Sequence, residues 1–133
     1  MVQVRYIVTD IDTAIAFYTQ QLGFHLDMHP GPNFAMLSLG DLRLVLSVPN
    51  PGGGGGKPMP DGRQQEPGGW NRFSLEVDDL EGMIQKLKRA GAHFRNDIVT
   101  GVGGKQTILE DPSGNPIELF EPLIEEARLP GKP

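Results

Sequence analysis

The side chains best suited to proton transfer in this chain are its three histidines, His25, His29 and His93. Histidine titrates near neutral pH, so it can act as a general base or bind a metal. His25 and His93 each follow a predicted helix, where an exposed or sheet-edge role is more common than a chemical one. His29 can reach a cleft from a loop, and we retain it as the general-base candidate among the three.

Two glycine-rich runs resemble phosphate-binding loops, but neither has the required context. In the first run, residues 52–57, Pro58 follows the lysine where a phosphate-binding loop needs serine or threonine. The second run, residues 101–105, precedes a predicted strand and does not connect a strand to a helix. A tight turn is the simpler interpretation, although its backbone amides can still contact a ligand.

Composition excludes several classes of partner and chemistry. The chain has no cysteine, which excludes disulfides, thiolate nucleophiles and zinc–thiolate sites. This is compatible with the cytoplasm, which is the expected location. Twelve basic and 17 acidic residues give a formal charge of −5, and both nucleic acid and anionic membranes select clustered positive charge. We also find no signal-peptide pattern and no apolar run long enough to cross a bilayer.

The elements that must position the candidate side chains occur twice along the chain. The first copy predicts strands over residues 4–8, 24–28, 34–39 and 42–48 and a helix over 13–22. The second copy predicts strands over residues 72–77, 92–95, 106–110 and 117–120 and a helix over 80–90. In each copy an aspartate precedes the helix as N-cap candidate (Asp10 or Asp12, then Asp78 or Asp79), and a glycine ends it. Two facing half-sheets form a cleft, and clefts bind small molecules.

The repeat predicts one domain over residues 1–133 with four parts. These parts are module one (1–49), a Gly/Pro-rich loop (50–69), module two (70–122) and a polar tail (123–133), whose end is expected to fray. The Gly/Pro-rich loop is too rich in glycine and proline for a regular element. It is either a flexible connector or a flap over the cleft, and both roles are compatible.

Three motifs together resemble one superfamily. They are Phe17-Tyr18, Leu22-Gly23-Phe24 and the run from Glu110 to Phe120, EDPSGNPIELF. The chain resembles the vicinal oxygen chelate superfamily, which contains glyoxalase I, extradiol dioxygenases, fosfomycin resistance enzymes and bleomycin resistance proteins. The resemblance implies an α+β fold in which two βαβββ modules form a curved eight-stranded cup. It also implies that the cup is completed in a homodimer.

The resemblance further implies where a metal would bind in this chain. The four ligand positions of the metal-dependent members correspond to Gln3, Val45, Arg72 and Glu118, and no histidine falls on them. Valine has no donor atom, and arginine carries a fixed positive charge that repels a divalent cation. We therefore expect no tightly bound metal and predict a salt bridge between Arg72 and Glu118 in its place. A loosely held divalent ion on Gln3 and Glu118 is the alternative.

Strand alternation adds further side chains that face the cup. These positions are Arg5, Ile7, Arg43, Ser47, Ser74, Glu76 and Phe120, with Trp70 at the rim. The predicted ligand-binding set therefore comprises Gln3, Arg5, Arg43, Val45, Ser47, Trp70, Arg72, Ser74, Glu76, Glu118 and Phe120.

Two functions remain open from the sequence. The favoured one is a small-molecule binding protein of the glyoxalase/bleomycin-resistance type, which sequesters a drug or metabolite without chemistry and so acts in antibiotic resistance. The alternative is a divalent-metal-dependent lyase, isomerase or dioxygenase. In the alternative, Glu118 would serve both as metal ligand and as the group that carries the proton.

Overall fold

The computed structural model describes residues 2–52 and 54–128 and shows an α+β protein with two sheets. The chain divides into two compact units. Unit 1 contains residues 1–69 together with 111–115, and unit 2 contains residues 70–110 together with 116–133. Residues 129–133 of the predicted polar tail lie outside the described residues. No helix in the described ranges has the length and apolar character needed to span a membrane.

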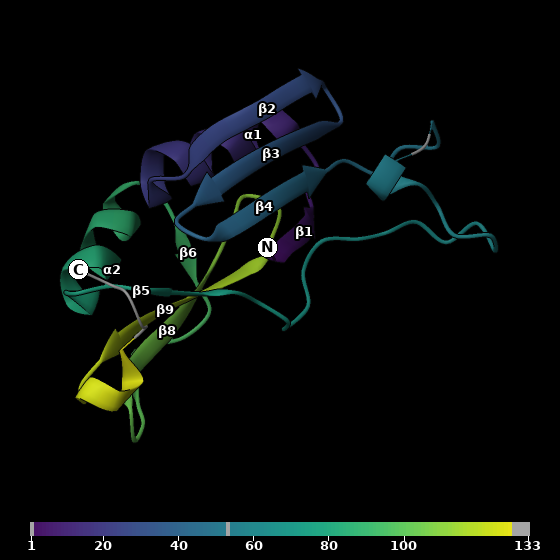
Figure 1. Cartoon of the computed structure of the whole chain (residues 1–133). Coiled ribbons are helices and arrows are strands. Elements are labelled where there is room, and N and C mark those ends of the chain that lie inside the picture. The colour runs from purple at the N-terminus through teal and green to yellow at the C-terminus, as the bar shows by residue number, and fades with distance from the viewer. Residues whose placement is uncertain (1, 53, 129–133) are drawn as a thin grey trace. The chain divides into compact units, whose positions relative to one another are not determined.

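Unit 1 is the first βαβββ module. Its elements are β1 (Val2–Ile7), α1 (Ile11–Ala16), the π-helix η1 (Phe17–Gln21), β2 (His25–Gly31), β3 (Phe34–Leu39) and β4 (Leu42–Ser47). The strand order is β1-β4-β3-β2, with β1 parallel to β4 and the other pairs antiparallel. Figure 1 shows β2, β3 and β4 side by side, with α1 against the sheet. The predicted strands of this module are confirmed.

The first helix begins where the sequence predicts and then changes type. The Asp10 carboxylate accepts a hydrogen bond from the Thr13 amide at 3.0 Å, which makes Asp10 the N-cap and lowers its pKa. From Phe17 onward the helix widens into η1, so the predicted helix over residues 13–22 is present, but only its first part is α-helical. The Thr19 hydroxyl donates to the Ile15 carbonyl at 2.7 Å, a bond of the kind that bends helices.

A buried polar cluster joins the segment 111–115 to the rest of unit 1. The Asp111 carboxylate accepts from the Tyr18 hydroxyl at 2.8 Å, from the Asn115 side chain at 3.0 Å and from the Ser113 and Asn115 amides. Asn115 also donates to the Ile7 carbonyl at 2.7 Å. Burial and the neighbouring Asp111 carboxylate raise the pKa of Tyr18 well above its usual 10.0. The motif that suggested the family therefore has a structural role in unit 1.

We expect this cluster to make the protein sensitive to alkaline pH. Because the folded pKa of Tyr18 lies above the unfolded value of 10.0, its contribution to stability is complete below pH 10 and is lost as the pH rises through the folded pKa. In Tyr18→Phe, the part of the alkaline loss that comes from this hydroxyl should disappear. Urea unfolding at several alkaline pH values checks this expectation. An unchanged slope of stability against pH in Tyr18→Phe would contradict it.

The Gly/Pro-rich loop has more local order than its composition predicts. It contains a short 3₁₀ helix, η2 (Gly54–Gly56), so the expectation of no regular element is wrong. The Asn50 amide donates to the Gly56 carbonyl at 2.9 Å, and the Gln65 side chain donates to the Gly55 carbonyl at 2.7 Å. A Cβ atom on Gly56 would collide with the Val48 carbonyl oxygen, which explains why glycine is needed there. Figure 1 shows the loop leaving the end of β4.

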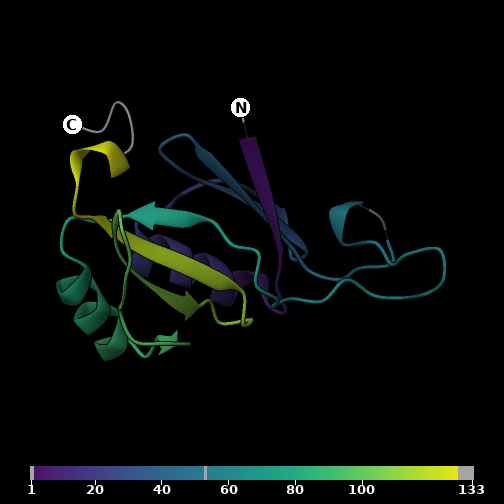
Figure 2. The ribbon, with the colours of Figure 1, turned by 90° about the horizontal axis from the view of Figure 1, so that it is seen from below.

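Unit 2 is the second βαβββ module, with one added strand. Its elements are β5 (Ser74–Glu76), α2 (Leu80–Arg89), β6 (His93–Phe94), β7 (Val99–Thr100), β8 (Gly104–Glu110), β9 (Pro116–Pro122) and the 3₁₀ helix η3 (Glu125–Ala127). The strand order is β5-β9-β8-β6, and β7 pairs with β8. Figure 2 shows α2 on one side of the sheet that contains β8 and β9. Asp79 is the N-cap of α2, where it accepts from the Gly82 amide at 3.1 Å.

Three details of unit 2 differ from the sequence prediction. Strand β5 is shorter than the predicted range 72–77, so Arg72 lies before the strand and not in it. The Glu118 amide still donates to the Phe73 carbonyl at 3.0 Å, so the chain runs beside β9 before the regular ladder begins. The short elements β7 and η3 have no counterpart in the prediction, because two or three residues carry too little periodicity to detect.

Candidate functional site

One face of the unit 1 sheet collects the predicted residues of module one. The register pairs Gln3 with Arg43, Arg5 with Val45 and Ile7 with Ser47. Residues paired in this way, and residues two apart on one strand, share a face of the sheet. The structure therefore places these predicted residues together on one surface of unit 1.

This face of unit 1 combines charge with a buried hydroxyl. The Ser47 side chain is buried, and its hydroxyl has no hydrogen-bond partner within the described residues. The Arg43 guanidinium lies 3.6 Å from the Asp27 carboxylate. The Arg5 guanidinium packs so closely on Gly55 of the Gly/Pro-rich loop that a Cβ atom there would overlap it. A buried hydroxyl without a partner is costly, so Ser47 is an unfavourable feature of this face in the free protein.

In unit 2, the predicted ion pair between Arg72 and Glu118 is present. Two guanidinium nitrogens of Arg72 contact one Glu118 oxygen, Nε at 3.0 Å and Nη2 at 2.9 Å. The other Glu118 oxygen accepts from the Ser74 hydroxyl at 3.1 Å. The side chains of Arg72 and Glu118 are 26% and 15% exposed, so this pair is largely shielded from solvent. Register also pairs Ser74 with Glu118 and Glu76 with Phe120, which puts these four predicted residues on one face.

A second ion pair on the same face was missed by sequence reasoning. The Arg95 Nε atom donates to the Glu110 carboxylate at 2.8 Å, and the Arg95 guanidinium stacks 4.8 Å from the centre of the Trp70 ring. The Trp70 side chain remains 70% exposed. The alternation Gln106, Ile108, Glu110 along the predicted strand was the available signal, because Ile108 pairs with Glu118 on this face. We call Trp70, Arg72, Arg95, Glu110 and Glu118 the Trp70 surface.

The three histidines lie at exposed or partly exposed positions. The His25 Nδ1 atom lies 2.8 Å from the Asp27 carboxylate, and this contact is the main cause of the lowered pKa of Asp27. The His29 Nε2 atom lies 3.9 Å from the exposed carboxylate of Asp12. His93 is exposed and pairs with Glu110 in the β6–β8 ladder. A general-base role for His29 stays a prediction.

The donor set at the expected metal position does not suit a divalent cation. Glu118 already uses both carboxylate oxygens, Arg72 places a positive charge beside it, and Val45 offers no donor. Gln3 belongs to unit 1, whereas Glu118 belongs to unit 2. In the part of the chain that the structure describes, no group of three or more His, Cys, Asp or Glu side chains is arranged to hold a metal. We therefore derive no chemical step through a metal.

Solved structures with the same fold belong to proteins with different activities. A member of the glyoxalase/bleomycin resistance protein/dioxygenase superfamily from Sphaerobacter thermophilus is 28% identical over 90% of this chain and 94% of its own, with a TM-score of 0.70. TnmS3, an antibiotic binding protein from a Streptomyces species, is 25% identical over 90% and 93%, with a TM-score of 0.68. Lactoylglutathione lyase from Agrobacterium tumefaciens, at 19% identity over 91% and 92% and a TM-score of 0.70, shows the fold alone.

The sequence itself matches a single family. No curated protein matches the chain. The Glyoxalase/Bleomycin resistance protein/Dioxygenase superfamily matches residues 1–119, which is most of the 133 residues. That match covers the first βαβββ module and the second as far as Leu119 in β9. The chain therefore belongs to the Glyoxalase/Bleomycin resistance protein/Dioxygenase superfamily.

Proposed function

We propose that this protein binds a small molecule, a drug or a metabolite, on the sheet faces described above and without a metal cofactor. The observation that carries the proposal is the combination, on the Trp70 surface, of an engaged Glu118 carboxylate with an exposed Trp70 ring. Glu118, which corresponds to a ligand position of the metal-dependent members, is held by Arg72 and Ser74. Beside it lies an indole that is 70% exposed. An exposed aromatic ring next to fixed charges is suited to hold a polar or aromatic ligand.

The Trp70 surface is built as a rigid platform. Glu110 fixes the Arg95 guanidinium, and the guanidinium in turn supports the Trp70 ring. The Trp70 backbone carbonyl accepts a hydrogen bond from Arg72 at 3.1 Å, which ties the Trp70 backbone to the Arg72–Glu118 ion pair. Less conformational entropy is lost when a ligand binds to side chains that are already positioned. TnmS3, which is 25% identical to this chain, is an antibiotic binding protein, and this similarity also supports a binding function.

The remaining predicted binding residues belong to the same proposal. Gln3, Arg5, Arg43, Val45 and Ser47 line the unit 1 face, and Ser74, Glu76 and Phe120 extend the Trp70 surface. We further infer a cytoplasmic protein whose cup is completed by a second copy of the chain. Sedimentation of the purified protein tests the dimer.

Trp70 is the single tryptophan of the chain, so its fluorescence reports directly on ligand binding. We expect bleomycin or fosfomycin, added to protein stripped with a chelator, to quench or shift this emission in a saturable way. Calorimetry should then show affinity at least about tenfold weaker, or about 1.4 kcal/mol, for Trp70→Ala. Arg63→Ala is the matched control, because Arg63 is exposed in the Gly/Pro-rich loop, and it should bind like the wild type.

The enzyme alternative makes an opposite set of predictions. In that case binding or turnover of S-lactoylglutathione would require Ni²⁺, Zn²⁺, Mn²⁺ or Fe²⁺, and Glu118→Ala would abolish both the metal content and the turnover. About one metal ion per chain, lost in Glu118→Ala, would overturn the proposal. Binding by metal-free protein, with no metal uptake, would support it.

A further inference from the structure

An open cavity in unit 2 lies between α2 and the segment that contains β6. It has a volume of about 630 Å³, and an adjoining cavity of about 370 Å³ shares Lys88, Asn96 and Asp97 with it. Phe94, which lines the cavity, pairs with Leu109 in the β6–β8 ladder. His93 and Arg95 flank Phe94 and also line the cavity, which therefore lies at the β6 edge of the sheet. Its size is in the range of small-molecule sites.

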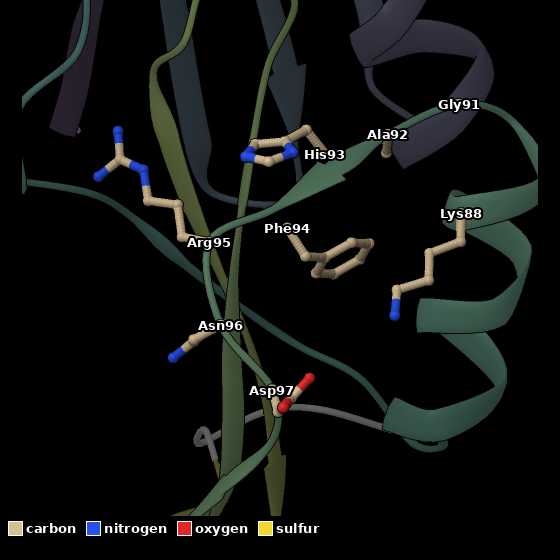
Figure 3. A pocket seen from close by; sticks show the side chains of 8 residues that line it. All are labelled: Lys88, Gly91, Ala92, His93, Phe94, Arg95, Asn96 and Asp97. Carbon is tan, nitrogen blue, oxygen red and sulfur yellow. The ribbon is translucent and has the colours of Figure 1, made fainter.

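Two charged side chains of opposite sign, Lys88 and Asp97, line this cavity without an ion-pair partner among the described residues. Figure 3 shows the Lys88 and Asp97 side chains pointing into the space beside the Phe94 ring. Across residues 2–52 and 54–128, neither of these two side chains forms an ion pair. The Lys88 ammonium instead lies 5.7 Å from the centre of the Phe94 ring, where the ring attracts it. Both charges are therefore available to a ligand.

The segment that carries Asp97 is held firmly in place. The Asn96 side-chain oxygen accepts from the Thr107 hydroxyl at 3.1 Å and from the Ile108 amide at 2.9 Å. The Thr107 hydroxyl also contacts the Asn96 carbonyl oxygen at 3.1 Å. These bonds fix the chain next to Asp97 before any ligand arrives. Preorganisation of this kind favours a specific site over a mobile surface loop.

The rest of the cavity is compatible with an apolar group. Ile84 of α2 and Ile98 line the adjoining cavity, and Phe94 lines the main one. Glu81, the other acidic residue there, is neutralised by Lys105 at 3.2 Å, a contact that also raises the pKa of Lys105. Arg95 and His93 also line the main cavity, and the Arg95 guanidinium is held by Glu110. Within the described residues, Lys88 and Asp97 are the lining charges left for a ligand, beside an apolar wall.

We propose that this cavity binds a zwitterionic small molecule with an apolar side group, which is the chemistry of a free amino acid or of the two ends of a short peptide. The ligand carboxylate contacts Lys88, its ammonium group contacts Asp97, and its apolar group lies against Phe94 and Ile84. A ligand with only one of the two charges would leave the other side chain without a partner.

The test is titration of isotope-labelled protein with L-phenylalanine and with the dipeptide Leu-Gly, followed by amide NMR shifts. At least one of these probes should give saturable shifts at Phe94, Asn96 and Asp97. N-acetyl-L-phenylalanine and L-phenylalaninamide each lack one charge and should bind at least about tenfold more weakly. If only the dipeptide binds, the natural source is a peptide; if only phenylalanine binds, it is a free amino acid.

Variants separate this site from a general surface effect. Lys88→Gln and Asp97→Asn should each weaken binding by at least about tenfold. Lys86→Gln is the matched control, because Lys86 lies on the same helix but does not line the cavity, and it should leave binding unchanged. The absence of shifts at millimolar probe, or equal binding of the single-charge compounds, would overturn the proposal. Arg43→Ala, on the unit 1 face of the proposed drug or metabolite site, should bind these probes normally, because Arg43 lines neither cavity, so this test is independent of that site.

Discussion

Asp111→Ala is expected to lower the free energy of unfolding by about 3–5 kcal/mol. The change removes the acceptor for at least two buried side-chain donors, the Tyr18 hydroxyl and the Asn115 amide, and each unsatisfied buried group costs about 1–3 kcal/mol. Asp111 is only 4% exposed, so water cannot replace the lost carboxylate without opening the structure. Such a loss is a large fraction of the 5–15 kcal/mol that stabilises a typical domain.

Urea unfolding followed by far-UV circular dichroism measures this loss. Asp111→Asn should cost less, because its side-chain oxygen can still accept and the Tyr18 hydroxyl can turn to accept from the new amide. Asp61→Ala is the control, since the Asp61 side chain is exposed, and it should change stability by no more than about 0.5 kcal/mol. Equal stability of Asp111→Ala and Asp61→Ala would show that the buried cluster contributes nothing.

The two modules could be predicted from sequence because their start and stop signals agree with their periodicity. Asp10 and Asp79 cap the two helices as expected, and Gly23 and Gly91 follow them in the left-handed conformation that favours glycine. The strands of unit 1 alternate clearly, so the residues that share a face followed from the pattern, whereas the pairing of β1 with β4 did not. Local signals and the fold point the same way at these positions.

Besides the short elements β7 and η3, the features that the sequence did not predict depend on partners far away in sequence. The α1 helix widens at Phe17 although residues 13–22 keep helical spacing, and Tyr18 there is bonded to Asp111, 93 positions later. Nothing near Tyr18 in the sequence reports that bond. In the same way, the EDPSGNP motif identified the resemblance, but its hydrogen bonds to Ile7 and Tyr18 became visible only in three dimensions.

In the candidate site, too, one ion pair could be predicted from the sequence and the other could not. The Arg72–Glu118 pair could be predicted because both residues fall on positions that converge in the family. The Arg95–Glu110 pair and its contact with Trp70 could not, since they depend on how a two-residue strand, β6, is aligned with β8. Strands this short leave register unspecified by pattern alone.

Breaking the Arg72–Glu118 pair is the second large effect expected. Glu118→Ala should destabilise the protein by about 1.5–3 kcal/mol, because hydrogen bonds to charged groups are lost in a largely shielded site. Arg72→Ala should cost less, because Ser74 continues to donate to the remaining carboxylate. The double variant should lose less free energy of unfolding than the sum of the two single variants. The difference, which is the coupling energy of the double-mutant cycle, should be about 1–3 kcal/mol.

A cycle on the exposed pair Arg63 and Asp61 is the matched control. Those side chains are 80% and 62% exposed and 3.7 Å apart, so their coupling should be close to zero. If the Arg72–Glu118 coupling were equally small, Glu118 would be energetically free to leave arginine and bind a cation. Glu118 would then again be a possible ligand for the metal-dependent enzyme alternative. A coupling of the expected size instead means that a metal must first displace Arg72, which would support the proposed binding without a metal.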